Sequence, residues 1–331
     1  MTTFVLINVT LLAILIATAL TISGMRTLYA ATMLTALFSL VTACLFVLLD
    51  AVDVAFTEAA VGVGISTVLL LGVLSLTRSR EAVTPRLRRL PGAVVVLFTG
   101  GTLIYASQDL PEFGSPTTPV QTHPLTDVYL RQSQEDIGIP NTVTSVLASY
   151  RGLDTLGELV VVFTAGVAVL ALLGPLMQPA EAREREVLDL VDYRVLRVVT
   201  GMLMPFILLF ALYVLFHGDF GPGGGFQAGV IFASGFVLYG LVFGLDRAQQ
   251  VLPRRVLWVL IAVGPVLYAG VGVANMLLGG AFLDYDTFAP DDAAAGQHIG
   301  ILLVESAIGV TVAAVMTSIF FGFANRVESS R

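Results

Sequence analysis

Nine long apolar stretches constrain the fold of this 331-residue chain more than any other feature. A helix that crosses a bilayer needs about 20 apolar residues, each adding about 1.5 Å of length. The stretches lie near residues 3–23, 28–49, 55–76, 91–107, 155–174, 195–216, 225–245, 255–279 and 299–323. The mean hydropathy is +0.89 and only 12% of the residues are charged, which exceeds what a soluble domain needs for its core. We therefore predict an all-α, polytopic transmembrane helical bundle of about nine spans.

The placement of the arginines predicts the topology. All 17 basic residues are arginine, so the chain has no lysine. If the spans alternate in direction, only Arg131 and Arg151 fall on one side of the membrane and the other arginines fall on the opposite side. The positive-inside rule puts the arginine-rich side in the cytoplasm. We predict that the N-terminus lies outside, as a retained first span without a basic leader, and that the C-terminus is cytoplasmic.

Two linkers divide the chain into three modules. Residues 77–90 are basic, and residues 175–194 are mixed in charge. We predict a three-span module over residues 1–79, a two-span module with a long external loop over 80–178, and a four-span module over 179–331. Near the end of that external loop, Asn141 is expected to cap a short helix that ends near Gly152.

Residue content excludes several classes of function. The single cysteine, Cys44, cannot form a disulfide or a cysteine-based metal cluster within the chain. The net charge of −7 does not suggest nucleic-acid binding. No cofactor motif or nucleophile constellation is present, so we expect no cofactor, no tightly bound metal and no enzymatic activity of the chain itself.

Three glutamates lie within the apolar stretches: Glu58, Glu158 and Glu305. An ionised acid at mid-membrane costs about 2.5–3.5 kcal/mol or more, so such residues usually face the protein interior and mark ion or proton pathways. Glu58 and Glu305 each begin a stripe of small residues at a spacing of four, which suits close helix packing, whereas the stripe after Glu158 is weaker. The alternative is that the three glutamates stay neutral and hydrogen-bond between helices as packing elements.

Each glutamate follows a polar entry on the predicted outer side. Glu58 lies about 7 Å beyond Asp53, Glu158 about 6 Å beyond Asp154 and Glu305 about 10 Å beyond His298, at about 1.5 Å per residue. We therefore predict that the three carboxyls share one layer in the outer half of the membrane.

A glycine-rich turn links the sixth and seventh apolar stretches. It contains Asp219, Pro222, Gly223, Gly224 and Gly225. Pro222 suits the first position of a helix, and the glycines permit close approach of neighbouring helices. We expect the free N–H groups of the new helix to face Asp219 or an anion. The alternative is an ordinary glycine-rich hairpin.

Three local patterns resemble subunits of known membrane complexes. The sequence DVAFTEAAVG, residues 53–62, resembles the third helix of the small subunit that corresponds to the C-terminal region of the large Mrp antiporter A subunit. The sequences NTVT at 141–144 and YRGLDTLGE at 150–158 are similar to the next segment of that region, which membrane-bound hydrogenases carry as a separate subunit. The sequence PGGGFQAG at 222–229 resembles the signature of the Mrp B subunit.

The resemblance covers most of residues 1–325 and departs from the family in two respects. Gly218 and Asp219 stand where the B-subunit pattern usually has Gly-His, and His217 lies two positions before Asp219. The antiporter-like core of a complete A subunit, with its lysines on broken helices, is missing. The resemblance therefore implies an accessory ion-path subunit rather than a pump module.

The function implied by the resemblance is that of a fused subunit of a multisubunit Na⁺ or K⁺/H⁺ antiporter, multi-pass in a bacterial plasma membrane. Its implied partners are other Mrp-type subunits, including large antiporter-like ones, together with the lipid bilayer, the cation and protons. Glu58, Glu158 and Glu305 would carry protons or coordinate cations, with Asp53, Arg151 and Asp154 at the outer entrance. Two alternatives stay open: a membrane-arm subunit of a hydrogenase-like or ferredoxin-dependent redox complex, and a structural adaptor.

Overall fold

The structure, a computed structural model, describes residues 2–76, 86–173 and 194–330, and these residues form helices and connecting turns without any strand. Nine helical spans in these ranges are long and apolar enough to cross a membrane, which confirms the predicted all-α, polytopic fold. The spans are Thr3–Gly24, Leu28–Leu48, Val52–Leu74, Leu90–Asp109, Gly152–Leu172, Arg194–His217, Gly225–Phe243, Arg254–Leu277 and Ala293–Ala324.

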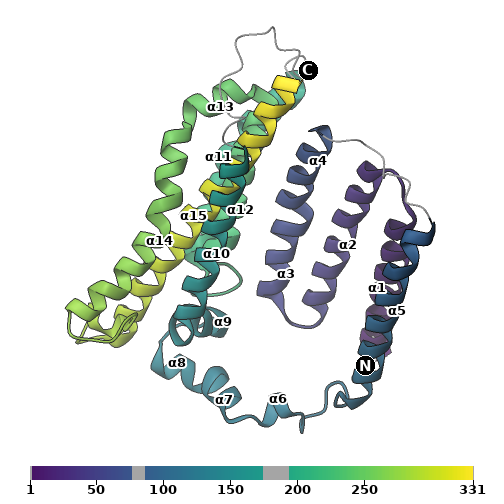
Figure 1. The fold of residues 1–331 in the computed structure, drawn as a ribbon. Helices are drawn as coiled ribbons and strands as arrows, with labels where there is room; N and C mark the ends of the chain where they lie inside the picture. The colour runs from purple at the N-terminus through teal and green to yellow at the C-terminus, as the bar shows by residue number, and fades with distance from the viewer. Residues whose placement is uncertain (1, 77–85, 174–193, 331) are drawn as a thin grey trace.

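The first three spans stand side by side (Figure 1). They are α1 (Thr2–Gly24), α2 (Leu28–Leu48) and a composite third span built from α3 (Val52–Glu58), the π-helical segment η1 (Ala59–Ile65) and α4 (Ser66–Leu76). Glycines at positions 62 and 64 lower the helix propensity within η1, and π-helical turns often occur at functional sites. The composite span joins the rest of the molecule, because η1 packs against α12 and α4 packs against α15.

The fourth span, α5 (Arg86–Ala106), lies beside α1, away from the C-terminal helices (Figure 1). The chain then returns to the bundle through a series of short helices. These are η2 (Ser107–Asp109), α6 (Pro119–Thr122), α7 (Pro124–Asp127), η3 (Val128–Gln132), α8 (Ser133–Asp136), α9 (Thr142–Thr144) and η4 (Ser145–Tyr150). Asn141 accepts a hydrogen bond from the Val143 N–H, which confirms its predicted role as a cap. The fifth span, α10 (Gly152–Leu173), follows directly.

The core of the molecule lies in the C-terminal bundle, around α15. This bundle contains α11 (Arg194–His217), α12 (Gly225–Phe243), α13 (Leu245–Val251), α14 (Arg254–Leu277), η7 (Tyr285–Phe288) and α15 (Ala293–Ser330). Glycines set the spacing of these helices: a Cβ on Gly229 would lie 2.6 Å from the Gly309 carbonyl oxygen, and one on Gly264 would lie 1.7 Å from Thr311 Oγ1. The predicted small-residue stripe after Glu305 therefore forms a close contact with α12.

The two ends of the chain lie at opposite ends of the helices, as an odd number of spans requires (Figure 1). Which end faces the cytoplasm stays a prediction from the arginine distribution. In a Cys44→Ala background, we expect a membrane-impermeant maleimide added to whole cells to label Thr3→Cys and Asp292→Cys but not Arg247→Cys in α13. All three positions are exposed on the chain, so access depends on the side of the membrane. The reverse labelling pattern would invert the topology.

Candidate functional site

The glycine turn brings α11 and α12 into backbone contact. The Gly224 N–H donates to the Val214 carbonyl at 3.1 Å, and a Cβ on Gly223 would lie 2.5 Å from the same oxygen. Gly224 has a φ of +124°, a backbone conformation that favours glycine. The prediction that Pro222 occupies the first helical position was wrong, because α12 begins at Gly225 and Pro222 lies outside the helix.

The N-terminus of α12 points at the carboxyl group of Glu305 on α15. The Gly225 N–H donates to Glu305 Oε2, and a Cβ on Gly225 would lie 2.0 Å from the Glu305 backbone oxygen. The positive end of a helix stabilises a nearby negative charge. The sequence predicted that these N–H groups would face Asp219 or an anion, but the group that accepts the Gly225 N–H is the carboxyl of Glu305.

Asn141 joins the external segment to the glycine turn. Its Nδ2 donates to the carbonyl oxygens of Gly218 and Gly221, both at 2.9 Å, and its backbone N–H donates to the Asp219 carbonyl at 3.0 Å. Thr144 adds a hydroxyl bond to the Gly218 carbonyl at 2.7 Å. These bonds satisfy carbonyl groups that the turn leaves outside any helix.

The composite third span reaches the same turn through Asp53 and Thr57. Asp53 Oδ1 accepts long hydrogen bonds of 3.4 Å from Asn141 Nδ2 and from the Gly223 N–H. One helical turn further on, Gln227 Nε2 of α12 donates to Thr57 Oγ1 at 2.8 Å. Side chains from three distant parts of the sequence thus meet at the start of α12, and we call this region the junction.

Glu58 is half-buried at the last position of α3, immediately before η1. A Cβ on Gly62 would lie 2.5 Å from Ser39 Oγ and 2.8 Å from Glu58 Oε1. The glycine therefore makes room for both the carboxyl group and the neighbouring helix α2. This contact agrees with the small-residue stripe expected from the sequence.

Glu158 differs from the other two glutamates, because it is exposed on the surface of α10. The inward-facing position expected for it is not what the structure shows. The buried side of α10 is instead formed by residues such as Leu159 and Gly166, and a Cβ on Gly166 would press against Val315 of α15. In the described parts of the chain, no hydrogen bond joins the three glutamates to one another.

A cavity of about 320 Å³ lies beside Arg151 and Asp154 at the start of α10. Arg151 Nε donates to Asp154 Oδ2 at 2.6 Å, and both side chains are more than half exposed. Tyr150, which also lines the cavity, donates to Asp136. Burial and this carboxylate raise the pKa of Tyr150 to about 12, so its hydroxyl stays protonated. The predicted entrance residues Arg151 and Asp154 therefore border this cavity.

Asp219 pairs with His298 of α15. His298 Nδ1 lies within hydrogen-bond distance of Asp219 Oδ2, and the aspartate side chain is only 9% exposed. Burial raises the pKa of Asp219 above its ordinary range, and the neighbouring His298 opposes that rise. The histidine therefore helps to keep a buried carboxylate ionised at the glycine turn.

We expect His298→Gln to lower the melting temperature of the detergent-solubilised chain by about 3 °C or more. The variant leaves the buried carboxyl group of Asp219 without its partner on α15, which destabilises the folded state. In an Asp219→Asn background no carboxyl group needs this partner, so the same substitution should lower the melting temperature much less. Equal losses in the two backgrounds would contradict the pairing.

Several polar residues at the site were not predicted as functional from the sequence. Thr57, Gln227 and His298 carry cross-helix contacts, and Asn141 was expected only as a cap. The one sequence signal for such residues is a polar side chain within an apolar stretch, and this signal does not show which residue on another helix it contacts. In the described ranges, no group of three or more His, Cys, Asp or Glu side chains could hold a metal ion.

Three family models match the chain in succession. Residues 13–79 match the D subunit of MBH, residues 87–187 match the E subunit of MBH, and residues 195–318 match "Domain related to MnhB subunit of Na+/H+ antiporter". The order of these matches is the order of the three resemblances in the sequence.

A relative with a longer chain shows the same combination. The chain is 26% identical over 274 residues to a protein of Rhizobium meliloti (strain 1021) that is described as a probable K⁺/H⁺ antiporter A/B subunit, covering 74% of this chain and 26% of that protein. The chain thus spans about a quarter of the length of this relative.

Two solved structures share the fold. A chain of the Mrp complex from Dietzia sp. DQ12-45-1b superposes with a TM-score of 0.76 and 25% identity, over 95% of this chain and 34% of that chain. A chain of an archaeal respiratory membrane complex, the membrane-bound sulfane sulfur reductase, gives a TM-score of 0.55 and 29% identity, over 71% of this chain and 97% of that chain.

Proposed function

Because the chain belongs to the family of Mrp-type antiporter subunits, with domains of the MBH D, MBH E and MnhB kinds in one polypeptide, we propose that it is a membrane subunit of a monovalent cation/proton antiporter complex. Its partners are the other subunits of that complex, including large antiporter-like ones. The complex exchanges Na⁺ or K⁺ for H⁺ across a bacterial plasma membrane, and this chain supplies part of the path.

The observation that carries this proposal is the carboxyl group of Glu305 at the N-terminus of α12. A carboxyl oxygen can accept this backbone N–H in both the neutral and the ionised form of the side chain. Such a group can bind either a proton or a cation, which is the exchange that an antiporter path requires.

The remaining acids extend this path on both sides of the junction. Ions enter at the cavity beside Arg151 and Asp154, where both charges are exposed to water. Asp53 draws cations toward the composite third span, and Glu58 receives them at the start of η1. The π-helical turn leaves local backbone groups less regularly bonded than in an α-helix, which suits a site that ions pass.

Glu158 indicates a neighbouring subunit on the surface of α10. An ionised acid that faces the hydrocarbon of the bilayer is costly, so an exposed glutamate within the span needs a protein neighbour or a water-filled path. The three predicted modules, 1–79, 80–178 and 179–331, then act together, because they jointly build the junction and present Glu158 to the adjoining subunit.

A second candidate is a membrane-arm subunit of a redox complex. The similarity to a chain of the sulfane sulfur reductase complex favours it, because 97% of that chain is covered. A third hypothesis is a structural adaptor whose glutamates only pack. It would apply if mutation of the glutamates left ion exchange unchanged.

Purification of the intact complex tests the assignment. We expect large antiporter-like subunits to copurify without iron–sulfur or hydrogenase-type subunits, and the complex in sealed vesicles to exchange Na⁺ or K⁺ for H⁺. The purified chain alone should give no exchange, since it has no lysine relay. Copurifying iron–sulfur subunits would favour the redox complex, and robust exchange by the chain alone would refute an accessory role.

A further inference from the structure

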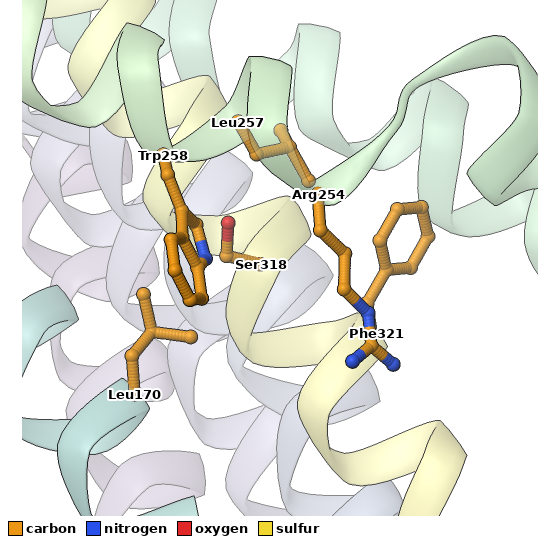
Figure 2. Close-up of a pocket in the computed structure, with 6 residues that line it drawn as sticks. All are labelled: Leu170, Arg254, Leu257, Trp258, Ser318 and Phe321. Carbon is orange, nitrogen blue, oxygen red and sulfur yellow. The ribbon is translucent and has the colours of Figure 1, made fainter. Parts of the chain in front are cut away.

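A small cavity lies between α10, α14 and α15, at the opposite end of the bundle from the glycine turn. It has a volume of about 10 Å³, and its lining residues are Leu170, Arg254, Leu257, Trp258, Ser318 and Phe321. Figure 2 shows Trp258 and Leu170 together on one side, Arg254 beside Phe321 on the other, and the Ser318 hydroxyl between them. The lining is therefore apolar apart from one cation, one indole N–H and one hydroxyl.

The hydroxyl of Ser318 is buried and has no hydrogen-bond partner in the described part of the protein. The residue is only 4% exposed. A buried hydroxyl without a partner costs about 1–3 kcal/mol, so native proteins usually pair it with a polar group or with water. A cavity of about 10 Å³ has room for one water molecule and not for a larger group. The serine thus indicates that a polar ligand lies at or near this cavity.

The first turn of α14 adds positive charge at the rim of the cavity. Arg254 is the first residue of the helix, after an N-terminal Pro253 that provides no side-chain cap. A helix N-terminus carries a partial positive charge, and a guanidinium group matches the geometry of a phosphate. Arg254 and the helix terminus together favour an anion at this position.

The neighbouring surface is suited to hydrocarbon. Trp258, one turn beyond Arg254, is 57% exposed, and Leu170 lines the same wall. Tryptophan side chains concentrate at the headgroup level of bilayers, where the ring contacts hydrocarbon and the N–H contacts polar groups. A cation at the rim above an exposed apolar wall fits a molecule with an anionic head and an apolar tail.

We propose that this site binds an anionic phospholipid of the leaflet at the arginine-rich ends of the helices. The phosphate lies at the rim beside Arg254 and the first turn of α14, because the cavity itself is too small to hold it. One water molecule links the phosphate to the Ser318 hydroxyl, and the upper acyl chain lies along Trp258 and Leu170. This site is separate from the ion path and holds whether the assembled complex is an antiporter or a redox enzyme.

Trp258 allows a direct test, because it is the single tryptophan of the chain. The purified chain is placed in lipid nanodiscs that contain a minor share of a brominated lipid, which quenches tryptophan fluorescence on contact. In one sample, brominated phosphatidylglycerol is the minor lipid in phosphatidylcholine. In the other, brominated phosphatidylcholine is the minor lipid in phosphatidylglycerol. We expect quenching by the anionic lipid to exceed quenching by the zwitterionic one by about fivefold. Equal quenching in the two samples would overturn the proposal.

Two neighbouring arginines provide a matched pair of variants. Arg254→Gln should abolish the preference for the anionic lipid, whereas Arg255→Gln, which removes the same charge from an exposed residue that does not line the cavity, should keep it. Arg254→Lys keeps the positive charge and should retain most of the preference for the anionic lipid. This result would show that the loss in Arg254→Gln comes from the missing charge and not from misfolding. If Arg254→Gln and Arg255→Gln lost the preference for the anionic lipid equally, general surface charge would explain the preference, and the proposed site would be refuted.

Ser318→Ala and inorganic phosphate complete the test. The alanine variant lacks the hydroxyl that the water bridges, so its lipid preference should fall without disappearing. Added inorganic phosphate should leave the preference unchanged, because the tail contributes to binding. Loss of the preference in phosphate would show a small-anion site instead and would refute lipid binding.

Discussion

Replacing Glu58 with glutamine is expected to lower cation/proton exchange by at least about tenfold in a complex that still assembles, the effect of roughly 1.4 kcal/mol on a limiting step. Glutamine keeps the shape and hydrogen-bonding capacity of the side chain but cannot ionise. Glu58 is half-buried beside Gly62 and Ser39, and no hydrogen bond in the described ranges engages its carboxyl group. The Glu58 carboxyl therefore has no competing hydrogen-bond donor, whereas one oxygen of the Glu305 carboxyl already accepts the Gly225 N–H.

The measurement is exchange in sealed vesicles, driven by an imposed proton gradient, with assembly checked by the size of the purified complex. Glu112→Gln is the matched control, because Glu112 is exposed in the external segment and outside the proposed path. It should exchange ions at the wild-type rate. If assembled Glu58→Gln did so as well, Glu58 would be a packing residue, and the path would have to rest on Glu158 and Glu305.

Replacing Gly225 with alanine should destabilise the contact between α12 and α15 strongly, although it adds only one methyl group. The added Cβ would lie 2.0 Å from the backbone oxygen of Glu305, and a backbone atom cannot move aside as a flexible side chain can. Overpacking of this kind costs about 1–3 kcal/mol or more, which corresponds to a fall of roughly 5 °C or more in melting temperature. The same shift would separate the N-terminus of α12 from the Glu305 carboxyl and lower exchange.

Gly270→Ala is the control for this substitution. Gly270 is also a helical glycine, but a Cβ there would have nothing within 4 Å. The gain in helix propensity should leave the melting temperature unchanged or slightly raised. Similar melting temperatures for Gly225→Ala and Gly270→Ala would show that α12 and α15 can separate without cost, and the junction would then be a loose contact.

Much of the architecture follows from local composition. The nine spans were predicted because the sequence has nine apolar stretches of about 20 residues, the length that a helix needs to cross a bilayer. The structure has nine such spans within its described ranges. The stripe of small residues after Glu305 predicted a close helix contact, and Gly309 lies against α12. The cap at Asn141 was predicted from its residue type and position alone.

The errors concern which groups meet. Pro222 was expected to begin α12, but the helix begins at Gly225, because Gly223 and Gly224 fold back on the end of α11. Asp219 was a candidate partner for the new helix, but the N–H of Gly225 bonds to Glu305, eighty residues further along the chain. Glu158 was expected inside, but the face of α10 that packs on α15 is the one that contains Leu159 and Gly166.

The sequence by itself determined the number of spans, the acids within them and the glycines that permit close helix approach, because these depend on hydropathy and residue size along a short stretch. Only the tertiary structure decided which acid lies at the N-terminus of α12, that Asn141 joins the external segment to the glycine turn, and which face of α10 is buried. These contacts depend on the rotation and offset of packed helices. A rotation of about 100° per residue moves a side chain from the core to the surface, and apolar spans in a membrane carry little amphipathic pattern to fix that angle.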